Sequence, residues 1–257
     1  MNGEMLQAAA DVIAIECCRK SGTILPAAEE NAPSREFQFL DGRHTCEYEK
    51  WVKWVNDDGI RKMILYPNMP KIVERRKTLG FSGAFLTIMP AFHANGEMTF
   101  WQNMWEYLKE ENRWKITTKE SAWENGPAEL IAFPGKPELE ALTQSLKAAV
   151  DLCEKIGAPE WKNVFLKSLL ILREEKYDLT GEDIQSYFHK YNGVLPKDNL
   201  RIFAASGNAF VFGAMGSWND APSGLAEKSG LQKEYDNISE MLLFGCVANL
   251  TYAVNNW

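Results

Sequence analysis

Apolar residues recur along this chain at the spacing of amphipathic helices. In three segments they fall at positions i, i+3, i+4 and i+7, which places each set on one face of a helix. The spacing therefore predicts helices over 48–55, 101–108 and 184–191.

Two further segments predict a helical hairpin. Residues 138–156 carry their apolar side chains on one side, and a short break separates them from residues 160–175. The second segment is apolar nearly all round, and a helix of that kind belongs in the middle of a structure. We therefore expect this helix to be central, with Phe165, Leu169 and Leu172 buried.

Helix ends are marked by cations followed by a glycine. Cations meet the negative end of the helix dipole, and glycine adopts the left-handed conformation that closes a helix. Helix starts are marked by capping-box patterns at Thr99 and Ser229, each with a glutamine three residues later, and by prolines that fit a first turn. The glycines are Gly22, Gly80, Gly157 and Gly193, and the prolines are Pro137 and Pro159.

Evidence for strands is thinner. Short runs rich in Phe, Ile, Leu and Val predict strands at 36–40, 128–133 and 208–213, while the run 81–89 fits either a strand or buried coil. These segments do not alternate with helices as strands do in parallel α/β folds. The chain is therefore expected to be mainly α with a minor β component (α+β), folded as a single, mostly helical globular domain over residues 1–257.

The charge balance narrows the choice of partner. The chain has 35 acidic and 28 basic residues, which gives a formal charge of −7. Nucleic acids and anionic lipids are themselves negative, so neither is favoured as a partner, whereas a basic protein is. Nine tryptophans exceed ordinary usage, and we expect most of them in the core and the remainder at an interface.

Cysteine usage and the apolar runs indicate the compartment. The five cysteines are scattered and odd in number, and no pair has the C-x-x-C spacing, which suits a reducing environment. The first residues carry no basic leader of the secretory type. The longest apolar run, 242–254, is too short to span a bilayer. The sequence therefore predicts a cytoplasmic protein that is not embedded in a membrane.

Signatures of known catalytic chemistry are missing from the sequence. It contains no phosphate-binding glycine loop, no H-E-x-x-H and no G-x-S-x-G. His44 stands two residues before Cys46, in the setting of a helix start beside a buried cysteine. His93 precedes Glu97 by four residues, but Asn95-Gly96 between them favours a turn over a helical metal site. His189 fits a helix end. We therefore expect no metal, no cofactor and, on balance, no enzyme.

The most distinctive segment runs from Gly213 to Asp220. A short apolar stretch enters a glycine-bordered turn that presents Trp218, followed by two residues that commonly form turns, Asn219 and Asp220. One interpretation makes Trp218, Asn219 and Asp220 an exposed surface that binds a partner. The other makes Trp218 a lid over the core and the polar pair simple turn makers.

The string VFGAMGSWND, at 211–220, resembles the C-terminal end of uncharacterised bacterial proteins, and this resemblance implies no activity. The whole profile is similar to that of bacterial immunity proteins that neutralise polymorphic toxins, because it is acidic, cytoplasmic, rich in tryptophan and without a catalytic signature. We therefore expect an immunity or inhibitor protein that binds a basic protein partner. The alternative is an enzyme of unrecognised type, with its site near the Gly213–Asp220 loop.

Overall fold

A computed structural model describes residues 3–26, 33–69, 72, 87–126, 130, 136–173, 188, 190–213 and 216–257. The chain divides into two compact units. The sheet unit comprises residues 4–69 and 83–132, and the helical unit comprises residues 1–3, 70–82 and 133–257. The expectation of a single domain stays a prediction.

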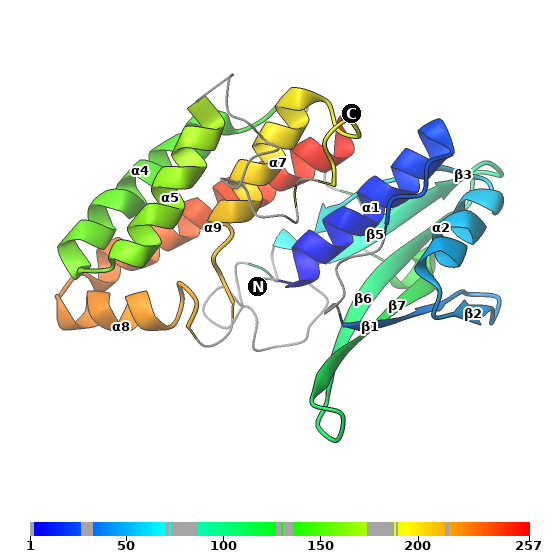
Figure 1. The fold of residues 1–257 in the computed structure, drawn as a ribbon, viewed down its shortest axis with the longest axis horizontal. Coiled ribbons are helices and arrows are strands. Elements are labelled where there is room, and N and C mark those ends of the chain that lie inside the picture. The colour runs from blue at the N-terminus through cyan, green and yellow to red at the C-terminus, as the bar shows by residue number, and fades with distance from the viewer. Residues whose placement is uncertain are drawn as a thin grey trace. The chain divides into compact units, whose positions relative to one another are not determined.

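The sheet unit is built around one curled, mixed sheet (Figure 1). Its described strands follow the order β2-β1-β7-β6-β5-β3, and β4 pairs with β5 beside this path. Neighbours are antiparallel except β1 and β7, which run parallel. The strands are β1 (Ser34–Gln38), β2 (His44–Thr45), β3 (Ile60–Met63), β4 (Tyr66–Pro67), β5 (Thr87–His93), β6 (Met98–Leu108) and β7 (Arg113–Ala122), followed by a short 3-10 helix, η1 (Trp123–Asn125).

Helices α1 (Gly3–Ser21) and α2 (Tyr48–Asp57) cover the same face of this sheet (Figure 1). From α2, the buried indole of Trp51 stacks on Phe37 of β1 at 4.5 Å and meets Trp101 of β6 edge to face at 5.7 Å. Aromatic pairs in these geometries add to the free energy gained by burying apolar surface. The expected helix over 48–55 is confirmed by α2.

A closed ring of polar side chains lies under α1. Asp11, fully buried on α1, forms a bidentate ion pair with Arg35 of β1, with N–O distances of 2.7 and 2.8 Å. Arg35 also donates to Thr118 of β7 at 2.7 Å, and the Thr118 hydroxyl donates to the side-chain oxygen of Asn103 at 2.7 Å. Asn103, on β6, closes the ring by donating to Asp11 at 3.0 Å. One helix and three strands are thereby joined.

The expected fold class was wrong, because the β component is not minor. The described strands form a seven-stranded sheet, and this sheet is the basis of one of the two compact units. The fold is α+β. The clearest error is segment 101–108, expected as a helix and found within β6. One inward position of β6 is the polar Asn103, which is buried because it belongs to the ring. The alternation of apolar and polar residues that is typical of a strand is therefore not visible in the sequence.

The other strand expectations had mixed outcomes. The strand expected at 36–40 is confirmed in its main part by β1, and the end of the run 81–89 enters β5. The strand expected at 208–213 was wrong, because α7 continues to Ala209 and irregular backbone comes after it. The expected strand at 128–133 and helix at 184–191 lie almost wholly outside the described residues.

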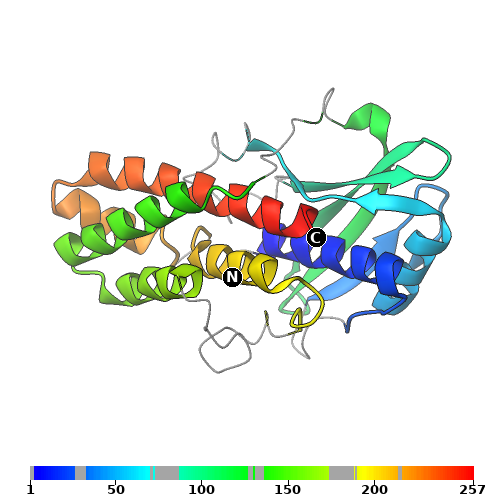
Figure 2. The same ribbon diagram turned by 90° about the horizontal axis from the view of Figure 1, so that it is seen from above.

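Among the described helices of the helical unit, four pack as a closed set of neighbours (Figure 2). Helix α4 lies against α5 and α9, and α7 also lies against α5 and α9. A fifth helix, α8, contacts α4 and α9. The bounds are α4 (Leu139–Ile156), α5 (Pro159–Arg173), α7 (Lys197–Ala209), α8 (Ala221–Lys228) and α9 (Gln232–Asn255). The helical hairpin expected from the sequence is confirmed by α4 and α5.

Helix α5 is not the central helix that its sequence suggested. Phe165 and Leu169 are buried as expected, but Leu172 is half-buried, and Leu166 and Leu170 are 38% and 49% exposed. Helix α9 is buried over a longer stretch than α5, since most of its side chains from Leu242 onward are buried. The apolar surface of α5 therefore did not indicate correctly whether this helix lies in the middle of the bundle or at its side.

Helix ends were predicted better than helix starts. Gly157 closes α4 in the left-handed conformation with a φ of +70°, and Pro159 is the first residue of α5. Both expected capping boxes were wrong, because Thr99 lies in β6 and Ser229 comes directly after the last residue of α8. The expected end at Gly80 lies outside the described residues.

Among the described helices, none combines the length and the apolar character needed to cross a bilayer. All five cysteines are free. Burial raises the pKa of the Cys153 thiol to about 12 and also raises that of Cys246, so both stay protonated near neutral pH.

Two glycines offer a test of helix packing. A Cβ on Gly245 of α9 would lie 3.2 Å from Leu142 Cα of α4, whereas a Cβ on Gly224 of α8 would meet nothing within 4 Å. We expect Gly245→Ala to destabilise the protein by about 1–3 kcal/mol through overpacking. Gly224→Ala should stabilise it by roughly 0.5–1 kcal/mol through helix propensity. Urea unfolding of both variants measures the difference, and equal stabilisation would show that the helices are not in close contact at Gly245.

Candidate functional site

The structure places Trp218 in the core of the helical unit. Its side chain is fully buried, and its indole N–H donates to Ser239 of α9 at 2.8 Å. Its ring stacks on Tyr235 at 5.3 Å and meets Phe165 edge to face at 5.0 Å. The interpretation of Trp218 as an exposed anchor is therefore not supported, and the alternative, a lid over the core, describes its position.

Its two neighbours hold the shape of the turn. The Asn219 side-chain oxygen accepts hydrogen bonds from the Gly213 N–H at 2.9 Å and from the Ser217 hydroxyl at 2.6 Å. The exposed Asp220 carboxylate accepts from the N–H of Gly216, whose φ is +76°. The described residues of the expected site therefore use their polar groups within the loop. That Asn219 and Asp220 bind a partner stays a prediction.

Tyr235 secures the same cluster from α9. Its hydroxyl donates to the backbone oxygen of Trp218 at 2.7 Å. Burial raises the pKa of Tyr235 to about 12, because the phenolate would lose its hydration. The neutral phenol is therefore part of the folded core.

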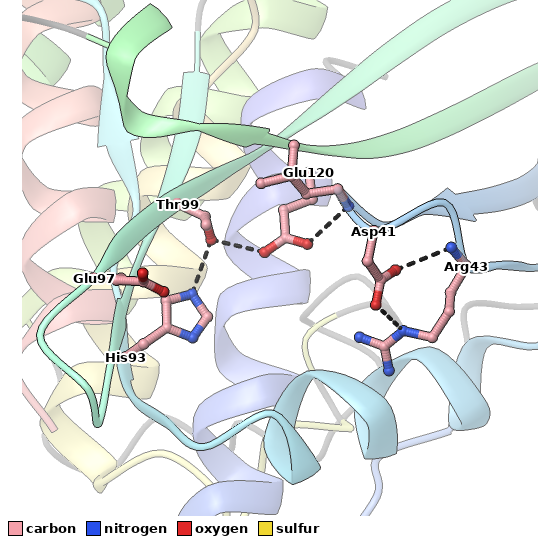
Figure 3. A pocket seen from close by; sticks show the side chains of 7 residues that line it. Asp41, Arg43, His93, Glu97, Thr99 and Glu120 are labelled. Carbon is pink, nitrogen blue, oxygen red and sulfur yellow. Dashed lines mark hydrogen bonds and ion pairs between the residues drawn. The ribbon is translucent and has the colours of Figure 1, made fainter.

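A separate polar hollow of about 270 Å³ lies within the sheet unit, between the β5–β6 hairpin and the turn after β1 (Figure 3). At its wall, the Thr99 hydroxyl donates to Glu120 Oε1 at 2.8 Å and contacts His93 Nε2 at 3.0 Å. The second oxygen of Glu120 accepts from the Leu40 N–H at 3.1 Å. The strand pairing creates this arrangement, because β6 lies between β5 and β7.

The order of these hydrogen bonds limits the chemistry of the hollow. A threonine hydroxyl has one hydrogen, and Thr99 gives it to Glu120, so His93 must donate its Nε2–H to the hydroxyl. In a nucleophilic triad the histidine instead accepts the proton of the hydroxyl. The arrangement therefore does not match an activated nucleophile, and it is suited to binding a polar or charged group.

Negative charge prevails around the hollow. Its lining includes the carboxylates of Asp41, Glu97 and Glu120 and the guanidinium of Arg43. Arg43 pairs with Asp41 at 2.7 Å and with Asp58 at 2.6 Å, and these partners raise the pKa of Arg43, the hydrogen bond to Asp58 contributing most. Since Arg43, the one lysine or arginine among the described residues of the lining, is already engaged, the hollow favours a cationic group over an anionic one.

The same charge bias extends over the whole sheet unit. This unit holds 18 of the chain's 35 acidic residues but only 12 of its 28 basic residues, so it carries −6 of the formal charge of −7. The helical unit is thus close to neutral. The acidic character noted in the sequence belongs to one structural unit, and any electrostatic attraction of a basic partner acts mainly there.

Two of the histidines and the nearby cysteine are among the described residues. His44 and Cys46 are both exposed around the short β2, so the expected buried cysteine was wrong. The turn expected at Asn95-Gly96 is confirmed, and Gly96 has a φ of +88°. His189 lies outside the described residues. Within the described part of the chain, no group of three or more His, Cys, Asp or Glu side chains is placed to hold a metal ion.

Sequence reasoning considered His93 but did not connect it with Thr99 or Glu120. A correct assignment of strands 98–108 and 113–122 would have shown that Thr99 and Glu120 share one face of a hairpin. Comparison of the chain with protein-family models, with curated proteins and with solved structures finds no match, so the case for a function rests on the geometry and charge of this chain alone.

The buried position of Trp218 can be tested by truncation. We expect Trp218→Ala to cost about 3–5 kcal/mol of stability, because a large side chain is removed from a packed cluster. Trp114→Ala, at a site that is 48% exposed, is the matched control and should cost less than about 1 kcal/mol. Urea midpoints measure both. Similar losses in the two variants would contradict the assignment of Trp218 to the core.

Tyr235 predicts a loss of stability in alkali. The folded protein keeps this phenol protonated to about pH 12, whereas the unfolded chain releases the proton near pH 10. The contribution of the neutral Tyr235 phenol to the stability of the folded protein is therefore complete below about pH 10 and falls as the pH rises toward 12. From pH 9 to pH 11, the free energy of unfolding measured with urea should fall more in the parent than in Tyr235→Phe. Both proteins contain the same cysteines, so the titration of the thiols cancels in this comparison. Equal losses would show that the phenol is not held neutral.

Proposed function

We propose that this chain is a cytoplasmic binding protein, an immunity or inhibitor protein that neutralises a toxin by direct contact with a basic surface. The observation that carries the proposal is the concentration of negative charge in the sheet unit, −6 of −7. Opposite charge on the partner would speed the encounter and make the complex sensitive to salt.

The hollow supports the same interpretation. Its exposed carboxylates, Asp41 and Glu97, line the same hollow as Glu120. A lysine or arginine of a partner would therefore meet several hydrogen-bond acceptors there. The enzyme alternative, placed at the Gly213–Asp220 loop, gains no support from the described residues of that loop. Their polar groups make turn hydrogen bonds, and the side chain of Trp218 is buried.

The proposal is tested by capturing the partner and measuring its kinetics. Crosslinking in the native host should enrich a basic protein, which is then purified and titrated against the parent. Neutralising two exposed carboxylates of the sheet unit, by Glu97→Gln with Glu124→Gln, should slow association about two- to fivefold at low salt and leave dissociation nearly unchanged.

The matched control removes the same charge from the helical unit, at the exposed Asp151 and Glu227, as Asp151→Asn with Glu227→Gln. This pair should associate at nearly the parent rate. Equal slowing by both pairs, or association that does not depend on salt, would refute docking through the acidic unit. Failure to enrich any basic protein would count against the proposed function itself.

A further inference from the structure

The β6–β7 hairpin extends past its neighbouring strands. The last described pairing of β7 with β1 is at Lys115, and that of β6 with β5 is at Trp101. Beyond these levels β6 and β7 pair only with each other among the described strands, as far as Leu108 and Arg113 (Figure 1). We call residues 104–116 the arm; its base still pairs with β1 at Lys115 and Ile116, and its free end runs from Tyr107 to Trp114.

Three aromatic rings lie together on the arm. Tyr107 and Trp114 are directly opposite in the strand pairing, with ring centroids 5.3 Å apart, and they are 42% and 48% exposed. Trp105 meets Trp114 edge to face at 6.2 Å and is half-buried. A two-stranded ribbon is marginal by itself, so these cross-strand contacts also help to hold the arm in shape.

The exposed rings are held in place before any partner arrives. The Tyr107 hydroxyl donates to the side-chain oxygen of Asn112 at 2.5 Å, and Asn112 has the left-handed backbone, with a φ of +49°, that closes the turn. A ring fixed in this way loses little conformational entropy on binding. Exposed tyrosine and tryptophan of this kind commonly provide most of the binding energy at protein interfaces.

The rest of the sheet unit shows what such rings bind. Arg43 lies 4.4 Å from the ring of Phe39, Arg35 lies 4.7 Å from that of Phe37, and Lys50 lies 4.7 Å from that of Trp54. Among the described residues, no cation of this chain lies over Trp114. The ring of Trp114, which is 48% exposed, therefore has no cation over it within the described part of the chain, and it belongs to a unit whose net charge is −6.

We infer that the arm is the docking surface for a cationic segment of the protein partner, with a lysine or arginine side chain packed on Trp114 and Tyr107. The inference rests on the proposed function and assigns part of the contact to a defined place. The ring faces attract the cation, and the acidic unit raises its local concentration. Trp114 acts as the anchor, while Tyr107 forms the second wall.

The test uses an octa-arginine peptide as the probe and the full chain as the protein. The indole N–H resonance of Trp114 is identified by its loss in Trp114→Phe, and its shift is followed during titration. We expect this resonance to move with the peptide and not with an octa-glutamate control. Trp114→Leu and Tyr107→Leu should each weaken binding about two- to fivefold. Tyr107→Phe, which keeps the ring, should bind nearly as the parent does.

Phe244→Leu is the matched control, because Phe244 is 52% exposed on the helical unit. It should bind the peptide as the parent does, and melting temperatures exclude unfolding as the cause of any loss. If the peptide binds but Trp114 does not respond, the arm is not the docking surface, although docking of a basic partner elsewhere on the sheet unit stands. If no cationic peptide binds at low salt, the proposed function fails as well.

A second copy of this chain is the other occupant that the rings would accept. Sedimentation of the parent and of Trp114→Leu over a range of concentrations separates the two cases. A parent that stays monomeric while it binds octa-arginine supports the inference. A dimer that dissociates in Trp114→Leu overturns it.

Discussion

The ion pair between Asp11 and Arg35 is the constraint on which the sheet unit depends. The carboxylate is fully buried and the guanidinium nearly so, and each charge is compensated only because the other is present. Removing one member of such a pair generally costs about 3–5 kcal/mol, since the other remains buried and uncompensated. Thr118 and Asn103 add hydrogen bonds to the pair, and the positions of α1, β1, β6 and β7 are thereby tied to one another.

This ring also explains which parts of the fold could be predicted from the sequence. The helices at 48–55, 139–153 and 161–172 were recognised because their faces are patterned by burial alone. Strands β6 and β7 were not recognised, because their inward positions include Asn103, Thr118 and Glu120. These polar residues are inside because they bind one another or a side chain from another element, and such a reason cannot be read from one segment at a time.

The same limit applies to the candidate sites. The Gly213–Asp220 loop was singled out for Trp218 and its glycines, but the sequence alone could not say whether the indole faced solvent or core. Its burial depends on Ser239 and Tyr235 of α9, about twenty residues later.

The arm was hidden for a different reason. Trp105, Leu108 and their neighbours fit a helical period as well as a strand, and only the pairing with β7 exposes Tyr107 and Trp114 together.

The parallel pairing of β1 with β7 has a consequence for how the sheet unit is assembled during synthesis. Arg35 and Thr118 are 83 residues apart, and Asp11 and Asn103 are 92 apart, so the ring joins parts of the unit that are far apart in the sequence. Contacts of such high sequence separation form slowly, because a long loop must be closed before any stabilisation is gained. While the chain emerges from the ribosome, the β6–β7 hairpin is local and can form early, but β1 must wait for it. The acidic unit therefore folds as a whole only after β7 has emerged, and its aromatic core stays accessible to chaperones until then.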